Sequence, residues 1–340
     1  MPLPPRFSAG LRLGDGAEGG AWRALDSDAG RQVVLKRVPQ ARAAQVRAAF
    51  RLLRTVSSPH LPVVHELVAD AGDLWLVTGF VEGQPLTPGP VGLRQALLEA
   101  AAIAHALHAI HEAGTHHGDL SAANVLRTPA GGVVVTDFGQ IGCLGCGTPG
   151  FLAPEVLAGG GGPGGDVFAL GSLLCLRLFG AVPWAAPAAV VDAQRRGPAA
   201  ALERVMELGV AAGVAVPAEL QALLVQLLHP DAQARLADLG PLPAHLRRLV
   251  AGMPGPGDRS EGSEGAGLGD RSVELGPTWW LPARWPYRGG GLEEVVAGLV
   301  DGGRARLVAV AGPVGAGLFG VEVPGVVMVR GLVAVSGRSA

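Results

Sequence analysis

The chain has 340 residues, of which 49% are hydrophobic and only 16% are charged. This supplies enough apolar material for one or two folded domains and excludes a wholly disordered protein. A formal net charge of −2 gives no electrostatic reason to expect nucleic-acid binding. Three cysteines are too few for a disulfide framework, and the first residues lack the pattern of a secretory leader. A cytoplasmic protein without a membrane partner is therefore expected.

Residues 11–38 predict three antiparallel strands, because apolar residues alternate around two turns. The first turn is rich in glycine, and Gly14, Gly16 and Gly19 would let the backbone lie close over phosphates, since no Cβ intervenes. In a chain with 53 glycines this spacing alone is weak. It also opens no helix, which argues against a dinucleotide-binding fold.

The third of these strands carries Lys36, the single lysine among 27 lysines and arginines. A compact ammonium on a flexible stem is well suited to binding phosphate, which favours a functional role. The alternative is that one lysine survives in an arginine-biased composition.

Residues 93–113 have a helical pattern that ends in glycine. His105, His108 and His111 repeat on it at three-residue spacing. A metal site is one interpretation, but helix histidines that face a core or a loop are commoner, and that interpretation is favoured.

Oxygen-bearing side chains gather in the stretch from His117 to Gly139. Asp119 and Asn124 lie on one loop, and Asp137 follows an apolar run. Mg²⁺ prefers one or two protein carboxylates together with substrate phosphates, so this set suits Mg²⁺-assisted phosphoryl transfer. The plainer alternative is that Asp and Asn are common turn residues.

Beyond this stretch, Cys143 and Cys146 form a Cys-x-x-Cys pair. Two further zinc ligands are missing, and a redox-gated loop is only a hypothesis. Residues 251–277 have the composition of a flexible linker. Residues 278–340 predict a short α/β fragment like a degenerate nucleotide-binding loop, because Gly312–Gly317 is followed by Leu and Phe instead of Lys and Ser/Thr. A membrane-spanning segment at 307–329 is considered and not favoured.

The motifs taken together resemble the eukaryotic-like, bacterial-type serine/threonine protein kinases over residues 7–250. The resemblance implies an α+β fold with a small β-rich lobe and a larger helical lobe. It rests on the following segments, which occur in the family's order: LGDGAEGGA at 13–21, Lys36, HGDLSAAN at 117–124, DFG at 137–139, GTPGFLAPE at 147–155, DVFALG at 166–171 and PDAQAR at 230–235.

The resemblance also implies roles for individual residues. Asp119 would orient the substrate hydroxyl, Asn124 and Asp137 would hold Mg²⁺, and Ser121 stands where the family has a catalytic lysine. ATP would be bound by the following residues: Leu13, Gly14, Gly16, Gly19, Ala21, Val34, Lys36, Thr78, Val81 and Leu126. Structural roles are implied for an ion pair between residues 155 and 235 and for residue 166, which would brace the catalytic loop.

The departures from the family pattern are equally specific. No acidic residue lies between Val38 and His65, so Lys36 would lack its usual glutamate, expected near Ala49. Asp137 or the phosphates would balance its charge instead. Gly118 stands where the family usually has an arginine that pairs with a phosphate on the following loop. Here that loop is short, and residues 140–147 contain no Ser, Thr or Tyr that could carry a phosphate. The replacement therefore fits the loop.

The predicted function is ATP- and Mg²⁺-dependent transfer of the γ-phosphoryl group to Ser or Thr hydroxyls of a protein substrate. The alternative is a pseudokinase that binds nucleotide or acts as a scaffold. A small-molecule phosphotransferase is a minor possibility, suggested by the His-Gly-Asp sequence at 117–119. The sequence leaves the oligomeric state open.

Overall fold

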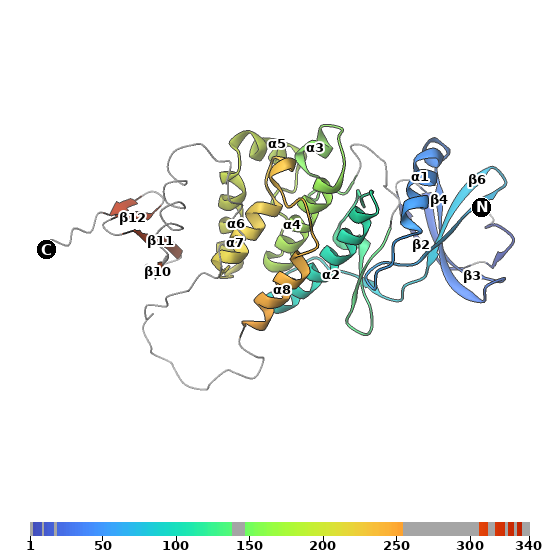
Figure 1. The fold of residues 1–340 in the computed structure, drawn as a ribbon, viewed down its shortest axis with the longest axis horizontal. Coiled ribbons are helices and arrows are strands. Elements are labelled where there is room, and N and C mark those ends of the chain that lie inside the picture. Colours follow the sequence, from blue (N-terminus) through green and yellow to red (C-terminus); the bar gives the residue numbers. More distant parts are fainter. Residues whose placement is uncertain are drawn as a thin grey trace. The chain divides into compact units, whose positions relative to one another are not determined.

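The computed structural model describes residues 3–8, 10–16, 19–137 and 147–253, together with the backbone of four strands between residues 306 and 334. The chain divides into two compact units, Met1–Gly255 and Pro256–Ala340. The first unit has a small lobe built on a sheet and a larger helical lobe (Figure 1). This is the two-lobed α+β architecture that the sequence predicts. Within the described part of the chain, no helix is both long enough and apolar enough to cross a membrane.

The small lobe is built on an antiparallel sheet in the order β1-β3-β4-β6-β5, with β2 paired to β3. Its strands are β1 (Phe7–Ser8), β2 (Arg12–Gly16), β3 (Gly19–Asp26), β4 (Arg31–Val38), β5 (Val64–Asp70) and β6 (Asp73–Gly79). Alternate residues of β4, such as Val33 and Leu35, are fully buried against Trp75 and Val77. The three strands predicted within residues 11–38 are confirmed.

Helix α1 (Ala43–Leu53), preceded by a short 3-10 turn at Gln40–Arg42, packs on this sheet. Val46, Ala49 and Leu53 recur at helical spacing and form its buried face. Val46 joins the core of β4 and β6, whereas Ala49 and Leu53 pack against Ile110 of the helical lobe. The helix therefore contacts both lobes.

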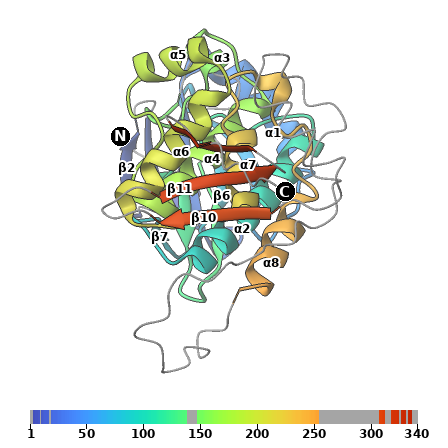
Figure 2. The same ribbon diagram turned by 90° about the vertical axis from the view of Figure 1, so that its left-hand side faces the viewer.

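The helical lobe is organised around two buried helices, α2 (Leu93–Glu112) and α4 (Pro163–Phe179), as Figure 2 shows from a second side. Helix α4 begins at Pro163, a residue type that is favoured in the first helical turn, and it is terminated by Gly180 in a left-handed conformation. The remaining helices are α3 (Pro154–Leu157), α5 (Pro187–Arg196), α6 (Ala199–Ala212), α7 (Ala218–Leu227) and α8 (Leu242–Ala251).

Three short strands flank the loops that carry Asp119, Asn124 and Asp137. Strands β7 (Gln84–Pro85), β8 (Val125–Arg127) and β9 (Val133–Val135) form an antiparallel sheet. The loop that precedes β8 contains a 3-10 turn at Ala122–Asn124, and a second 3-10 turn, Ala232–Ala234, follows α7.

One buried carboxylate connects four parts of the helical lobe. Glu99 of α2 accepts hydrogen bonds from Arg177 of α4 at 2.7 and 3.2 Å, and it also pairs with Arg127 of β8. Arg177 in turn donates to the carbonyl oxygens of Thr87 and Gly89 at 2.7 and 3.1 Å. The segment that leaves the small lobe is thereby fixed to the core of the large one. The sequence analysis did not identify this network.

The described strands of the second unit differ from the α/β fragment expected there. Strands β10 (Arg306–Ala311), β11 (Gly317–Val323), β12 (Val326–Val329) and β13 (Leu332–Ala334) pair antiparallel in chain order. Residues 312–316 thus connect two antiparallel strands, whereas a phosphate-binding loop connects a strand to a helix. The valine-rich strands account for the apolar character of 307–329.

Replacing Glu99 with Gln should destabilise the first unit strongly. The substitution keeps the volume but leaves the buried Arg177 guanidinium without a carboxylate, which typically costs ~3–5 kcal/mol. Glu207→Gln is the matched control, because Glu207 pairs with Arg204 on the surface, where such pairs contribute ~1 kcal/mol or less. Urea unfolding of the full chain measures both variants. Equal unfolding midpoints would contradict the importance assigned to the Glu99 network.

Candidate active site

The loop from His117 to Asn124 is held by the carboxylate of Asp166, at the start of α4. Asp166 Oδ2 accepts the amide of His117 at 2.8 Å, and Oδ1 accepts the amide of Gly118 at 2.9 Å. The ring of His111, at the end of α2, lies 2.8 Å from the same carboxylate. Asp166 thus braces the loop as the sequence predicts, and His111 is an additional contact that the sequence analysis did not assign.

Asp166 stays ionised although it is buried. Burial by itself would raise the pKa of this carboxyl, but the hydrogen bond from His111, the charges of His111 and His117 and the amide of Gly118 outweigh it. The net result is a pKa below the usual value for an aspartate. A negative charge is therefore available to hold the two backbone amides.

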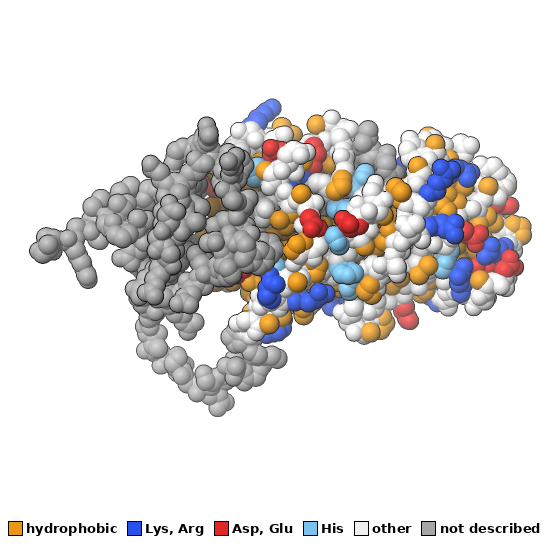
Figure 3. All heavy atoms as spheres, viewed as in Figure 1, with side chains coloured by type: hydrophobic (Ala, Val, Ile, Leu, Met, Phe, Trp, Pro, Cys, Tyr) orange, Lys and Arg blue, Asp and Glu red, His pale blue; other side chains and the backbone are white. Residues whose placement is uncertain are grey.

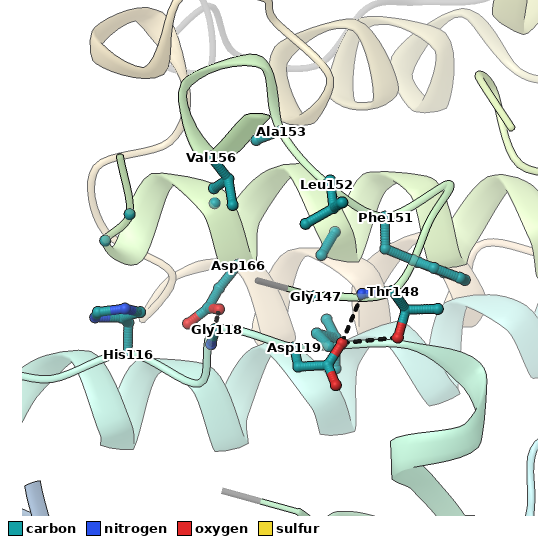
Figure 4. A pocket seen from close by; sticks show the side chains of 15 residues that line it. His116, Gly118, Asp119, Gly147, Thr148, Phe151, Leu152, Ala153, Val156 and Asp166 are labelled. Atoms are coloured by element: carbon teal, nitrogen blue, oxygen red, sulfur yellow. Dashed lines mark hydrogen bonds between the residues drawn. The ribbon is translucent and has the colours of Figure 1, made fainter. Parts of the chain in front are cut away.

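Asp119 projects from this loop toward the segment that precedes α3 (Figure 4). Its Oδ1 accepts both the backbone amide of Thr148, at 2.9 Å, and the Thr148 hydroxyl, at 2.7 Å. Asn124 Nδ2 donates to the Asp119 carbonyl at 2.8 Å and to its Oδ2 at 3.2 Å. A carboxylate, an alcohol hydroxyl and a side-chain amide therefore meet at one point. Thr148 was not singled out as an Asp119 partner, although it lies within the quoted 147–155 motif.

The residues expected to bind metal approach from two sides of the β8–β9 hairpin. The amide of Thr136 donates to the carbonyl of Asn124 at 2.8 Å, which places the next residue, Asp137, beside the catalytic loop. The ring of His117 contacts the carbonyl of Thr136 at 2.9 Å from the other side. Asp137 has a φ of 67°, a left-handed conformation that is unusual outside glycine and that turns the chain at this point. Phe138 and Gly139 lie outside the described residues.

Lys36 forms an ion pair with Asp137. The lysine lies on β4, and the aspartate follows β9, so this pair joins the two lobes. Helix α1 places Ala49 in its buried face, and no glutamate is available there. One of the two charge-balancing partners proposed for Lys36 from the sequence is thereby observed.

The predicted nucleotide-binding residues are brought together on the small lobe and the β7–β8 pair. Ala21 pairs with Lys36 across β3 and β4, and Val34 pairs with Thr78 across β4 and β6. Leu126 of β8 lies opposite Pro85, in the segment that follows Val81. The backbone of the glycine turn joins β2 to β3, with Gly14 opposite Ala21 and Gly16 opposite Gly19, while Leu13 on β2 is exposed.

The segment that follows Val81 passes close to strand β8. A Cβ at Gly83 would lie 2.8 Å from the carbonyl oxygen of Arg127 and 3.2 Å from the Leu126 side chain. Glycine therefore permits the approach between the segment and strand β8. This approach brings Val81 and Leu126, two predicted nucleotide contacts, into the same region.

Ser121 occupies the position of the family's lysine but is 2% exposed. Its Oγ has no hydrogen-bond partner among the described residues. A neutral hydroxyl at this depth does not supply the positive charge that a lysine would, so a catalytic contribution from Ser121 stays a prediction.

A hollow next to Asp119 is lined by the two segments that meet at Thr148. Apolar side chains form most of its wall, and Figure 4 shows Phe151, Leu152 and Val156 around it, with Gly118 and Gly147 beside Asp119. Glycines 161, 162 and 165 also line the hollow. The hollow therefore offers apolar side chains directly beside a hydroxyl-accepting carboxylate, with Asp166 and His116 also in its wall.

The ion pair predicted between residues 155 and 235 is confirmed. Arg235 Nη1 and Nη2 contact the two carboxylate oxygens of Glu155 at 2.6 and 2.9 Å. Arg235 also donates to the carbonyls of His229 and Gly164. The pair fixes the segment after Thr148 to the helical lobe and is structural.

The three histidines of α2 contact different partners. His105 lies 3.1 Å from Ser58 Oγ, His108 lies 3.2 Å from Asp238, and His111 contacts Asp166. Among the described residues no group of three His, Cys, Asp or Glu side chains could hold a metal. Cys143 and Cys146 lie outside the described residues.

Comparison of the sequence with known proteins assigns the chain to a family. A model of the family described as "Protein kinase domain" matches residues 7–244. The chain belongs to the protein kinase family. Over 206 residues it is 32% identical to a putative CBL-interacting protein kinase 27 of Oryza sativa, covering 54% of this chain and 51% of the rice protein.

Two bacterial relatives are similar over the same region of this kinase-family chain. It is 30% identical over 216 residues to the DNA damage-responsive serine/threonine-protein kinase RqkA of Deinococcus radiodurans, covering 54% of this chain and 32% of that protein. It is 28% identical over 223 residues to serine/threonine-protein kinase PknA of Mycobacterium tuberculosis, covering 57% and 52%. The chain thus spans between about a third and a half of the curated relatives it matches.

The fold is shared with a solved kinase structure. Rad53 residues 1–466 in complex with AMP-PNP superimposes with a TM-score of 0.58 and 22% identity, covering 71% of this chain and 64% of that one. At this identity the likeness establishes the fold alone.

The depressed pKa of Asp166 leads to a pH prediction. Because the folded pKa lies below the unfolded value of about 4, the stabilisation from this carboxylate is complete above about pH 5 and is lost as the pH falls further. Asp166→Asn should lower the free energy of unfolding by about 2–3 kcal/mol near pH 7. That difference should shrink toward about pH 3. Urea unfolding over this range measures it, with the exposed Asp192→Asn as control; a pH-independent difference would refute the charged role.

Proposed function

We propose that this chain is a protein kinase that uses Mg·ATP to phosphorylate Ser or Thr hydroxyls of a protein substrate. The observation that carries this proposal is the contact between Asp119 and the Thr148 hydroxyl at 2.7 Å. The contact supports the proposal, because it places an aliphatic hydroxyl within hydrogen-bond distance of the Asp119 carboxylate. The relatives named as serine/threonine-protein kinases support the same reaction.

In the proposed reaction, Asp119 accepts the proton of the substrate hydroxyl. The hydroxyl oxygen forms a bond to the γ-phosphorus while the bond from that phosphorus to the β-phosphate oxygen breaks, and ADP leaves. Asn124 fixes Asp119 through hydrogen bonds to its backbone and its carboxylate. Positioning of this kind is the main contribution of a kinase to phosphoryl transfer.

The residues proposed to hold Mg²⁺ provide suitable donors. Asn124 uses its Nδ2 toward Asp119, so its amide oxygen is oriented away from that contact, and Asp137 supplies a carboxylate. A Mg²⁺ ion held by these two residues would supply positive charge that offsets the negative charge of the phosphates. Lys36 would then exchange its contact with Asp137 for the phosphates, which would free the carboxylate for the metal.

The apolar hollow beside Asp119 supports a polypeptide substrate. Phe151, Leu152 and Val156 provide an uncharged surface within the same site as the hydroxyl-accepting oxygen. A side chain next to the phosphorylated residue would bury apolar area there, which contributes roughly 25 cal/mol per Å². A small polar metabolite would gain little from this surface, so the phosphotransferase alternative is not favoured.

A pseudokinase is the second candidate, and two observations favour it. Ala49 stands at the position where the resemblance implies a glutamate for Lys36, and Ser121 is buried without a charge to offer the transferring group. Loss of one such electrostatic donor typically lowers a rate by ~10²–10³. This reduction is compatible with a slow enzyme.

The direct test is transfer of labelled γ-phosphate from Mg·ATP to the full chain itself and to a generic protein substrate. Asp119→Asn should reduce transfer by ~10²–10⁴, because a neutral amide accepts a proton poorly, while Mg·ATP binding is retained. The exposed Asp192→Asn is the matched control and should transfer normally. Absence of transfer by the wild-type chain with intact Mg·ATP binding would establish the pseudokinase instead.

Restoring the absent carboxylate should raise activity. In Ala49→Glu, the longer side chain would extend from the buried face of α1, where Ala49 packs against Ile110, toward Lys36. A pair between this glutamate and Lys36 would release Asp137 for Mg²⁺, and we expect transfer to increase by about tenfold. Ala48→Glu is the control, because Ala48 is the neighbouring exposed residue of the same helix. Steady-state rates at saturating ATP measure the effect. Equal rates for the two variants would show that the missing glutamate does not limit the enzyme.

A further inference from the structure

Helix α1 presents a row of arginines to solvent. Arg47 and Arg51 are one turn apart, and Arg54 follows at the helix end, so the three recur at spacings of four and three residues on one face. All three are exposed, and their face lies apart from the buried Val46, Ala49 and Leu53. In Figure 3 blue side chains lie over the region where Figure 1 places α1.

The arginine face, defined as Arg47, Arg51 and Arg54, is not neutralised within the described part of the chain. No ion pair joins any of the three to another described residue, and the only contact of this kind is Arg54 over the Phe50 ring at 5.6 Å. The sequence offers no acidic residue between 38 and 65. Other arginines of the small lobe do form ion pairs, as Arg37 does with Asp73 at 2.6 Å.

Stabilisation of the helix itself explains only part of this arrangement. Cations in the last turn interact favourably with the helix dipole, which accounts for Arg51 and Arg54. Arg47 lies too far from the helix end for this effect, and its like-charge neighbour one turn away opposes helix formation. Repulsion among the three exposed guanidinium groups therefore destabilises the helix, and an external anionic partner would offset this repulsion.

We propose that the arginine face of α1 is a docking surface for an acidic segment of a partner protein. The three guanidinium groups span two helical turns, or about 10 Å. A partner helix with glutamates at the same four- and three-residue spacing can pair with each of them, and the guanidinium fork matches carboxylates in a bidentate manner. Charge complementarity of this type gives specificity and fast association.

A protein partner fits the face better than a nucleic acid does. Nucleic-acid binding depends on many phosphate contacts, and the chain as a whole carries a net charge of −2. Three cations on one short helix are too few to overcome that balance. The same three cations match one face of a short acidic helix.

The test uses the full chain and a fluorescein-labelled helical peptide of about 20 residues, or roughly 30 Å, with glutamates at alternating spacings of four and three. Fluorescence anisotropy at about 0.05 M salt should detect binding that weakens at about 0.3 M. The triple variant Arg47→Gln, Arg51→Gln, Arg54→Gln should bind about tenfold more weakly, as expected for the loss of three exposed charge pairs. A peptide with glutamine in place of glutamate should not bind.

The matched control removes the same charge elsewhere, through Arg195→Gln, Arg247→Gln and Arg248→Gln, and its affinity should stay within about twofold of wild type. Replacing the three α1 arginines with glutamate should transfer binding to a lysine version of the peptide. Melting temperature and Mg·ATP affinity verify that each variant is folded.

Several outcomes would overturn the proposal. Equal weakening in the control variant would indicate a general charge effect, and equal or tighter binding of single-stranded DNA would assign the face to nucleic acid. Tighter peptide binding after neutralising Asp258, Glu261 and Glu264 would assign it to the chain's own segment instead. An absence of peptide binding by wild type would also refute it.

Discussion

The geometry around the reacting position depends on a carboxylate that takes no part in the chemistry. Asp166 lies in the core of the helical lobe, yet it remains charged because it accepts the amides of His117 and Gly118 and contacts His111. Only an ionised acceptor offers two oxygens for two amides from consecutive residues. The loop that carries Asp119 is therefore attached to α4, the most buried helix of the lobe. Its position is therefore tied to the core of the helical lobe.

A second constraint follows from the absence of a glutamate on α1. In the described structure Lys36 pairs with Asp137, which is also the proposed metal ligand. The Lys36–Asp137 pair therefore joins a group proposed to bind phosphate to a group proposed to bind the metal. In the proposed reaction Lys36 would contact the phosphates and Asp137 would hold Mg²⁺, so binding of nucleotide and of metal would be coupled through this pair.

Much of this arrangement was predictable from the sequence, and the exceptions have physical causes. The strands at 11–38, the Glu155–Arg235 pair and the brace at Asp166 follow from local patterns and from motifs with fixed spacing. The Glu99–Arg177 network does not, because its members lie 78 residues apart and neither has a motif. The C-terminal fragment is a second exception. A strand and a glycine-rich loop can be followed either by a helix, as in a phosphate-binding loop, or by a second strand, and the residues around Gly312 alone do not distinguish the two.

The contact between Asp119 and Thr148 could be taken for a blocked site, since both oxygens of the carboxylate already accept hydrogen bonds. Oδ1 accepts twice from Thr148, and Oδ2 accepts once from Asn124. A carboxylate, however, has about four lone-pair positions. One position therefore remains for a substrate hydroxyl while the other bonds persist. An asparagine at 119 would lack this capacity, because its single oxygen would be fully used by Thr148. In the proposed reaction Thr148 and Asn124 would thus orient the carboxylate, and its remaining lone-pair position would accept the substrate hydroxyl.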